Sequence, residues 1–137
     1  MLLREQLVSK KFTLETVDDH QAKGVDDQIW VRKFAAAGGE AIVGGDSAMT
    51  KRPHELLAIK DTGLRLVALH PNWPRAKKHV QIAYLFFWWP HIEAVLSTSK
   101  EGDLFRVPWA WDDGQAITEL TPNVDRARER AARQRDG

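Results

Sequence analysis

Two short apolar segments on either side of a helix-like segment constrain the fold of this chain most. They are EAIVGG at residues 40–45 and LRLVAL at residues 64–69, with RPHELLAIKDTG between them. Pro53 stands where the first turn of a helix accepts proline, and Gly63 stands where helices commonly end. Two strands joined by such a helix pair in parallel through a right-handed crossover. The pattern predicts an open sheet with helices packed on it.

The alternation of strands and helices continues on both sides of this unit. We expect further strands at 12–17 and 103–107, a helix from Asp26 or Asp27 to about Ala37, and a helix over 75–97 that Pro90 kinks or splits. This succession predicts an α/β fold with three layers, α/β/α, around a central parallel sheet. We expect one domain over residues 1–120, and then a basic C-terminal tail at 121–137 that is helical or disordered.

Composition excludes several classes of site. The chain of 137 residues has a formal charge of +1 and no cysteine, which excludes disulfides, thiolate zinc sites and cysteine nucleophiles. Its five histidines show no spacing typical of metal ligands, so we expect none of them to bind a metal. No apolar run approaches the length that spans a bilayer, and we therefore expect a soluble, cytoplasmic protein without a membrane partner.

Carboxylates mark the candidate site. Asp46 follows the strand at 40–45, and Asp26 and Asp27 open the preceding helix. In open α/β sheets ligands bind beyond the carboxyl ends of the strands, so these acids are expected on one rim. Carboxylates gathered in one pocket need a cation or a proton, and Mg²⁺ suits oxygen ligands. The competing interpretation is that each aspartate caps the element beside it.

Several residues around this rim are candidates for supporting roles. Glu55 and Ser47 are expected to support the metal ligands from the outside, although Glu55 is equally placed to pair with Arg52. Lys51 and Arg52 are expected to contact RNA phosphates, as basic side chains commonly do.

A set of motifs resembles the PIN-like domains related to VapC-type toxin nucleases. The motifs are DQIW (27–30), AIVGGDSAM (41–49), KRPHELLAIKDTGLRLVAL (51–69), NWP (72–74) and FFWWPHI (86–92). The resemblance covers about residues 12–107 and rests on the order and spacing of these motifs. It implies an α/β/α fold and an acidic cluster that binds Mg²⁺ or Mn²⁺ for RNA cleavage. Carried onto this chain, it makes Asp27 and Asp46 catalytic metal ligands.

The resemblance has one departure. Such domains usually begin with a central strand that ends in a metal-binding aspartate, whereas MLLREQL at the start of this chain matches the helix after that strand. We therefore expect the first strand and its aspartate to be missing. The true start then lies upstream, or the remaining strands have closed up, or a partner supplies the element.

The leading hypothesis is a metal-dependent endoribonuclease that is the toxin of a toxin–antitoxin pair. The alternative is a non-catalytic PIN-like module that binds protein or RNA. A phospho-acceptor receiver domain is a third, disfavoured class, because Asp26, Asp27 and Asp46 do not follow strands in a receiver's order. The four adjacent aromatic residues 86–89 cannot all face one side of a helix, which predicts a contact with an antitoxin or in a homodimer.

Overall fold

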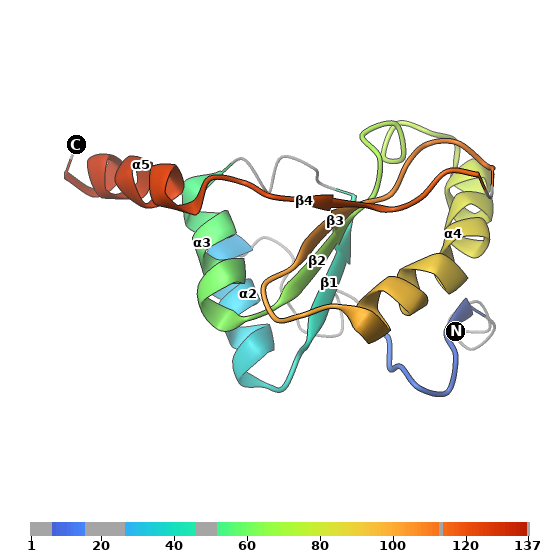
Figure 1. Ribbon diagram of the computed structural model, residues 1–137, viewed down its shortest axis with the longest axis horizontal. Coiled ribbons are helices and arrows are strands. Elements are labelled where there is room, and N and C mark those ends of the chain that lie inside the picture. The colour runs from blue at the N-terminus through green and yellow to red at the C-terminus, as the bar shows by residue number, and fades with distance from the viewer. Residues whose placement is uncertain (1–6, 16–26, 46–51, 113, 137) are drawn as a thin grey trace.

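The computed structural model describes residues 7–15, 27–45, 52–112 and 114–136, and it forms a mixed α/β fold. Helices and strands alternate along most of the chain, as the sequence predicts (Figure 1). The elements in chain order are α2 (Asp27–Ala36), β1 (Ala41–Gly44), α3 (Pro53–Thr62), β2 (Arg65–Ala68), α4 (Lys78–Thr98), β3 (Leu104–Arg106), β4 (Thr118–Leu120) and α5 (Val124–Asp136).

Four strands form one sheet in the order β1-β2-β3-β4. The first three are parallel, with Ile42 opposite Leu66 and Leu66 opposite Leu104. β4 pairs antiparallel with β3, so the sheet is mostly parallel with one antiparallel strand at its edge. The alternation of helices and strands does not predict β4 because no helix separates it from β3.

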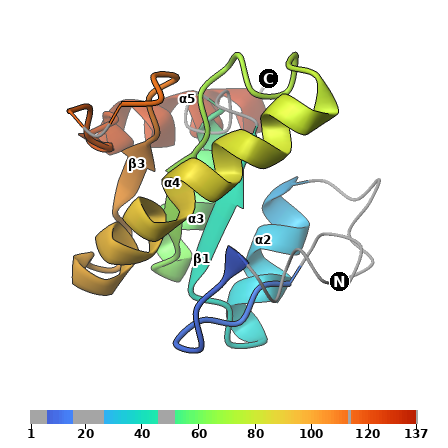
Figure 2. The same ribbon diagram turned by 90° about the vertical axis from the view of Figure 1, so that its right-hand side faces the viewer.

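Helices cover both faces of the sheet and make three layers. α2 and α3 lie on one side of the strands and α4 lies on the other (Figures 1 and 2). Side chains alternate between the two faces, so Leu66 and Leu104 join the core under α3, while Val67 and Phe105 join the core under α4. The expected α/β/α architecture is therefore confirmed.

Helix α3 shows how local signals and burial act together. Pro53 occupies its first turn, and Gly63 ends it with φ 75°, a left-handed conformation that glycine adopts without steric cost. Leu56, Leu57 and Ile59 are buried, and each contributes about 1.5–3 kcal/mol relative to an exposed side chain. The cap signals set the ends of the helix, and burial supplies most of its stability.

The C-terminal segment is helical over α5 and packs against α3. Ala127 and Ala131 are buried at this contact, and the Arg128 guanidinium donates to Asp61 Oδ1 at 2.9 Å. Small side chains let the two helices approach closely.

Two other expectations have mixed outcomes. The described part of the predicted strand at 12–17, residues 12–15, forms no strand, so that prediction is wrong there. Phe12 and Leu14 instead line an apolar cavity without joining the sheet.

α4 continues through Pro90, so the proline does not split the helix. None of the helices within the described ranges has the length and apolarity needed to cross a bilayer.

Candidate functional site

The carboxyl ends of the three parallel strands lie side by side and form one edge of the sheet. The Leu69 N–H donates to the Gly44 carbonyl at 2.9 Å, and the Val107 N–H donates to the Ala68 carbonyl at the same distance. α3 runs back between β1 and β2, so Pro53 at its amino end returns to this edge. α2 runs antiparallel to β1 before the chain turns into that strand (Figure 2). This edge is where an open α/β sheet binds its ligand.

The predicted acids are only partly within the described residues. Asp27 is the first residue of α2, whose amino end points to the carboxyl edge, but its side chain lies outside the description. Asp26, Asp46 and Ser47 lie outside the described residues altogether. Asp46 follows the carboxyl end of β1, Gly44, by two positions. The described starts and ends that lie at this edge are therefore those of α2 and β1, and the two principal acids stay a prediction.

Glu55 and Arg52 stand together at the start of α3. The Arg52 guanidinium donates to Glu55 Oε1 at 3.2 Å, which is the pairing anticipated as the alternative role of Glu55. Arg52 is the more exposed partner, with 48% of its side chain accessible against 15% for Glu55. Glu55 therefore orients a solvent-facing cation. Lys51 lies outside the described residues.

His70 and Arg106 also occupy the carboxyl edge, and the sequence analysis assigned neither a role there. The Asn72 N–H donates to His70 Nδ1 at 3.1 Å, so Nδ1 is an acceptor and the neutral ring carries its proton on Nε2. Burial, and then the charge of Arg106, lower the pKa of His70 below its ordinary value. Arg106 Nε is itself buried, with no hydrogen-bond partner among the described residues. His70 directly follows a predicted strand and Arg106 lies near the end of another, and this is the only sequence signal that marks them.

Aromatic rings continue this edge toward α4. The Trp109 ring lies 5.7 Å from His70 and 5.1 Å from Tyr84, between ring centroids. Trp111 lies 6.0 Å from Tyr84 and 5.9 Å from Phe87. Offset and tilted pairs at such distances are favourable. The rings therefore form one connected group that links the segment after β3 to α4.

Two buried side chains of α4 fix the segment after β3. The Tyr84 hydroxyl donates to the Pro108 carbonyl at 2.8 Å, and Trp88 Nε1 donates to the Ala110 carbonyl at 3.0 Å. Tyr84 and Trp88 are fully buried, and burial raises the pKa of Tyr84 to about 12. In Figure 1 this segment runs from β3 to the amino-terminal half of α4 before it returns to β4.

The turn after β1 is fixed from the α4 side by Trp73. Trp73 Nε1 donates to the Gln81 carbonyl at 3.2 Å, and Gln81 Nε2 donates to the Trp73 carbonyl at 2.8 Å. A Cβ atom on Gly45 would lie 2.8 Å from the Trp73 indole, closer than such contacts allow. Only glycine fits at position 45 beside this ring.

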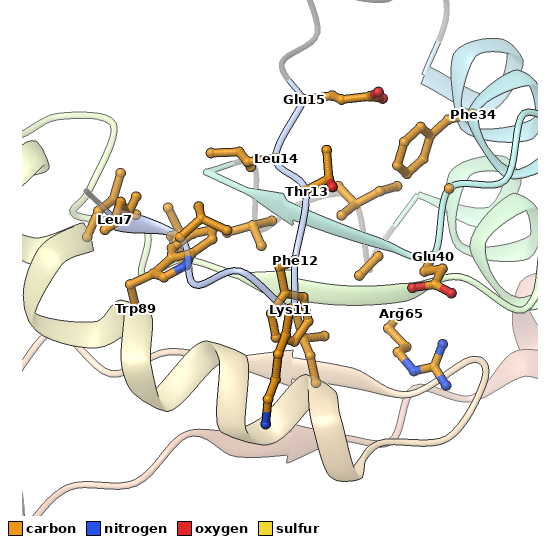
Figure 3. Close-up of a pocket in the computed structure, with 18 of the residues that line it drawn as sticks. Leu7, Lys11, Phe12, Thr13, Leu14, Glu15, Phe34, Glu40, Arg65 and Trp89 are labelled. Atoms are coloured by element: carbon orange, nitrogen blue, oxygen red, sulfur yellow. The ribbon is translucent and has the colours of Figure 1, made fainter. Parts of the chain in front are cut away.

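A cavity of about 840 Å³ opens on a different part of the sheet. It lies between β1, α4 and the segment 7–15, and Figure 3 shows that segment running across β1. Leu7 and Trp89 line one side of it and Phe34 lines another. Of its charged residues, Arg65 is already engaged, because its Nε donates to Ser99 Oγ at 2.7 Å. Recognition of a polar substrate needs convergent polar atoms, so the carboxyl edge is the better candidate.

A divalent cation suits the predicted acids by its chemistry. Mg²⁺ and Mn²⁺ prefer carboxylate oxygens and water, which Asp27 and Asp46 can supply. Within the described ranges, no three histidine, aspartate or glutamate side chains gather closely enough to hold a metal ion. Any such site must therefore include acids whose side chains lie outside those ranges.

The fold and its polar carboxyl edge define an open-sheet α/β/α domain, a class in which ligands bind beyond the strand ends. A family model described as PIN like domain matches residues 2–70, half of the chain. The chain therefore belongs to the PIN-like domain family, a superfamily that includes nucleases. Neither the curated proteins nor the solved structures gave a match.

Proposed function

We propose that this PIN-like protein is a metal-dependent endoribonuclease. One observation carries the proposal: the carboxyl end of β1, which leads to Asp46, lies at the edge of the sheet where α2 begins with Asp27. This arrangement supports the proposal that the two carboxylates meet at one rim. Membership of the PIN-like family supports phosphodiester hydrolysis as the reaction, because the superfamily includes nucleases.

Asp27 and Asp46 would hold Mg²⁺ or Mn²⁺, with Asp26 as a further ligand and Ser47 and Glu55 as supports. When bound, such an ion supplies polarisation of a phosphoryl oxygen and acidification of water. The protein's own task is to hold the phosphodiester next to these acids. Carboxylates repel a polyanion, so cationic side chains must surround them.

Cationic side chains stand at the carboxyl edge of the sheet. Arg52 faces solvent at the start of α3, and Lys51 precedes it in the sequence. Arg106 ends β3 and keeps one buried donor, Nε, without a partner in the described part of the chain. We assign these residues to the RNA phosphates on either side of the cleaved bond.

The proposal extends to a toxin of the VapC type, paired with an antitoxin. It rests on the order and spacing of the motifs, from DQIW (27–30) to FFWWPHI (86–92). The aromatic run gives the antitoxin, or a second copy of the chain, a contact point, because Phe86 is 38% exposed on α4. Exposed aromatic side chains often anchor protein interfaces.

The test is cleavage of a mixture of tRNA and rRNA in the presence of Mg²⁺ or Mn²⁺. Replacing Asp46 with asparagine removes one charge with little change in volume, and we expect it to slow cleavage by about a hundredfold or more. EDTA should abolish cleavage. The matched control is Asp125→Asn, which changes an exposed acid in the first turn of α5 and should leave the rate unchanged.

Three outcomes separate the hypotheses. Loss of cleavage in EDTA and in Asp46→Asn, but not in Asp125→Asn, supports the nuclease. Cleavage that survives Asp46→Asn refutes the assigned site. RNA binding without cleavage by the unchanged protein indicates the alternative, a non-catalytic PIN-like binding module.

A further inference from the structure

One side of β1 has no neighbouring strand. β1 is an end strand of the sheet and pairs with β2 alone among the described strands. The Leu69 N–H donates to the Gly44 carbonyl at 2.9 Å, which identifies the backbone groups of β1 that face β2. In a strand the groups of the intervening residues point the other way. The N–H and C=O groups of Ala41 and Val43 therefore face away from β2, and no group within the described ranges bonds to them.

The cavity of about 840 Å³ lies along this open side of β1. Its wall combines residues of the strand with apolar side chains of α2 and of α4: Ala41, Val43, Trp30, Phe34, Leu85 and Trp89. Figure 3 shows that the chain from Lys11 to Glu15 crosses β1 instead of running alongside it. We call this space, which lies next to a strand and between two helix layers, the β1 gap.

The β1 gap requires two properties of an occupant. The unpaired groups of Ala41 and Val43 need donors and acceptors that repeat along a strand, and the two helix layers need apolar side chains on both faces. An extended polypeptide supplies both, as when a peptide adds to the edge of a sheet. A small apolar ligand would leave the backbone groups without partners. The edge strands of a second copy fit poorly, because β1 contains alanine and glycine and β4 contains Thr118 and Glu119.

The apolar runs of this chain are already used elsewhere. A strand with helix layers on both faces is apolar at successive positions, whereas residues 12–15 alternate and expose Thr13 and Glu15. Runs of four or more apolar residues in the sequence belong to described elements or extend one residue beyond them: 34–37 in α2, 56–59 in α3, 66–69 in β2 and 82–89 in α4. None of these runs is left for the β1 gap.

We propose that the β1 gap binds an extended segment of a partner protein, which joins the sheet as a strand beside β1. The partner's backbone pairs with Ala41 and Val43, and its successive side chains point in turn toward α2 and toward α4. Such a segment is rich in valine, isoleucine or leucine, because both of its faces are buried. The inference goes beyond the proposed nuclease activity and does not depend on it.

The experiment uses a synthetic peptide, KKVIVIVKK, in which lysines keep an apolar extended core in solution. The control peptide has the same sequence with N-methyl groups on the core amides, which removes the backbone donors and keeps the side chains. Binding of the fluorescein-labelled peptides is followed by anisotropy. Strand pairing is followed residue by residue through amide hydrogen exchange of the ¹⁵N-labelled protein.

Two substitutions at Val43 separate the backbone from the side chain. Val43→Pro removes the N–H that faces the gap and breaks no hydrogen bond to β2, and edge strands accept proline. Val43→Ala is the matched control, because it shortens the same side chain and keeps the N–H. If Val43→Pro does not fold, the N-methylated peptide makes the same test from the partner's side.

In the protein alone we expect fast exchange at Ala41 and Val43 and slow exchange at Ile42 and Gly44. The peptide should slow exchange at Ala41 and Val43 by about tenfold or more, which corresponds to at least one hydrogen bond. Val43→Pro should weaken binding of the peptide by about tenfold relative to Val43→Ala.

Four outcomes overturn the inference. Failure of the peptide to bind, or equal binding of the N-methylated peptide, excludes strand addition. Slow exchange at Ala41 and Val43 in dilute protein alone means that a segment of this chain fills the gap, and protection that rises with protein concentration means that a second copy fills it. Because neither measurement uses RNA, failure of the nuclease proposal leaves this inference standing.

Discussion

Replacing Tyr84 with phenylalanine removes one hydroxyl from a fully buried site and leaves the ring in place. That hydroxyl donates a 2.8 Å hydrogen bond to the Pro108 carbonyl, whereas its contact with the His70 N–H is long, at 3.5 Å. The cost is therefore that of one good hydrogen bond, with a partly buried carbonyl left without this donor. Such a loss amounts to about 1–2 kcal/mol.

This free energy corresponds to a measurable shift in the melting temperature. Unfolding entropies of about 2.1 cal/mol/K per residue convert the loss into a decrease in Tm of about 3–7 °C for 137 residues. Thermal unfolding followed by far-ultraviolet circular dichroism measures the decrease in Tm, and tryptophan fluorescence reports the packing of Trp109 and Trp111 against Tyr84 at the same time. Phe86→Leu, on the exposed side of the same helix, is the control and should change stability by less than about 0.5 kcal/mol.

The reasoning has a clear point of failure. If Tyr84→Phe melts within error of the control, then the hydroxyl does not fasten the segment after β3 to α4. The hydrogen bond from Trp88 Nε1 to the Ala110 carbonyl would then be the main polar contact of α4 with this segment among the described residues. A decrease in Tm well above the calculated range would instead mean that the ring itself repacks.

Two further predictions concern charge. Arg106→Gln should weaken RNA binding about equally for all sequences and reduce the slope of log affinity against log salt by about one. Arg133→Gln, which changes an exposed side chain of α5, should have no effect. An unchanged salt slope for Arg106→Gln would contradict the phosphate contact. Alkaline pH should destabilise the fold through Tyr84, because its pKa is about 12 when folded and 10 when unfolded. The contribution of neutral Tyr84 to the free energy of unfolding is complete below pH 10 and is lost as the pH rises from 10 through 12. Urea unfolding over that range should therefore show a steeper decrease in the free energy of unfolding for the unchanged protein than for Tyr84→Phe. An equal decrease in both proteins would be evidence against the raised pKa.

Elements with strong local signals could be predicted from the sequence. The strand that precedes Asp46 and the helix between Pro53 and Gly63 are marked by an apolar run, an early proline and a terminal glycine. β4 has no such mark, because its three residues are largely exposed and are extended only through pairing with β3. The alternating residues 12–15 show the reverse case, in which an apolar pattern serves packing without forming a strand.

The candidate site also contains features that could be predicted from the sequence and features that could not. The direction of β1 toward Asp46 follows from the sequence, since a parallel strand fixes which edge its end reaches. The contribution of Arg106 does not follow, because its place depends on β3 pairing with β2 rather than with β1. The neighbourhood of His70 and Trp109 likewise depends on contacts between residues far apart in the chain. The sequence predicts where strands end, but only the order of the strands in the sheet determines which strand ends are neighbours.

The close fit between Gly45 and Trp73 makes the geometry after β1 depend on α4. No space remains for a side chain at position 45, and the two hydrogen bonds with Gln81 hold Trp73 to the first turn of that helix. A displacement of the amino end of α4 therefore pushes on the backbone one residue before Asp46. This transmission is steric repulsion, which neither salt nor protonation weakens. Any molecule that controlled the carboxylate by this route would have to move the helix and not merely change a charge.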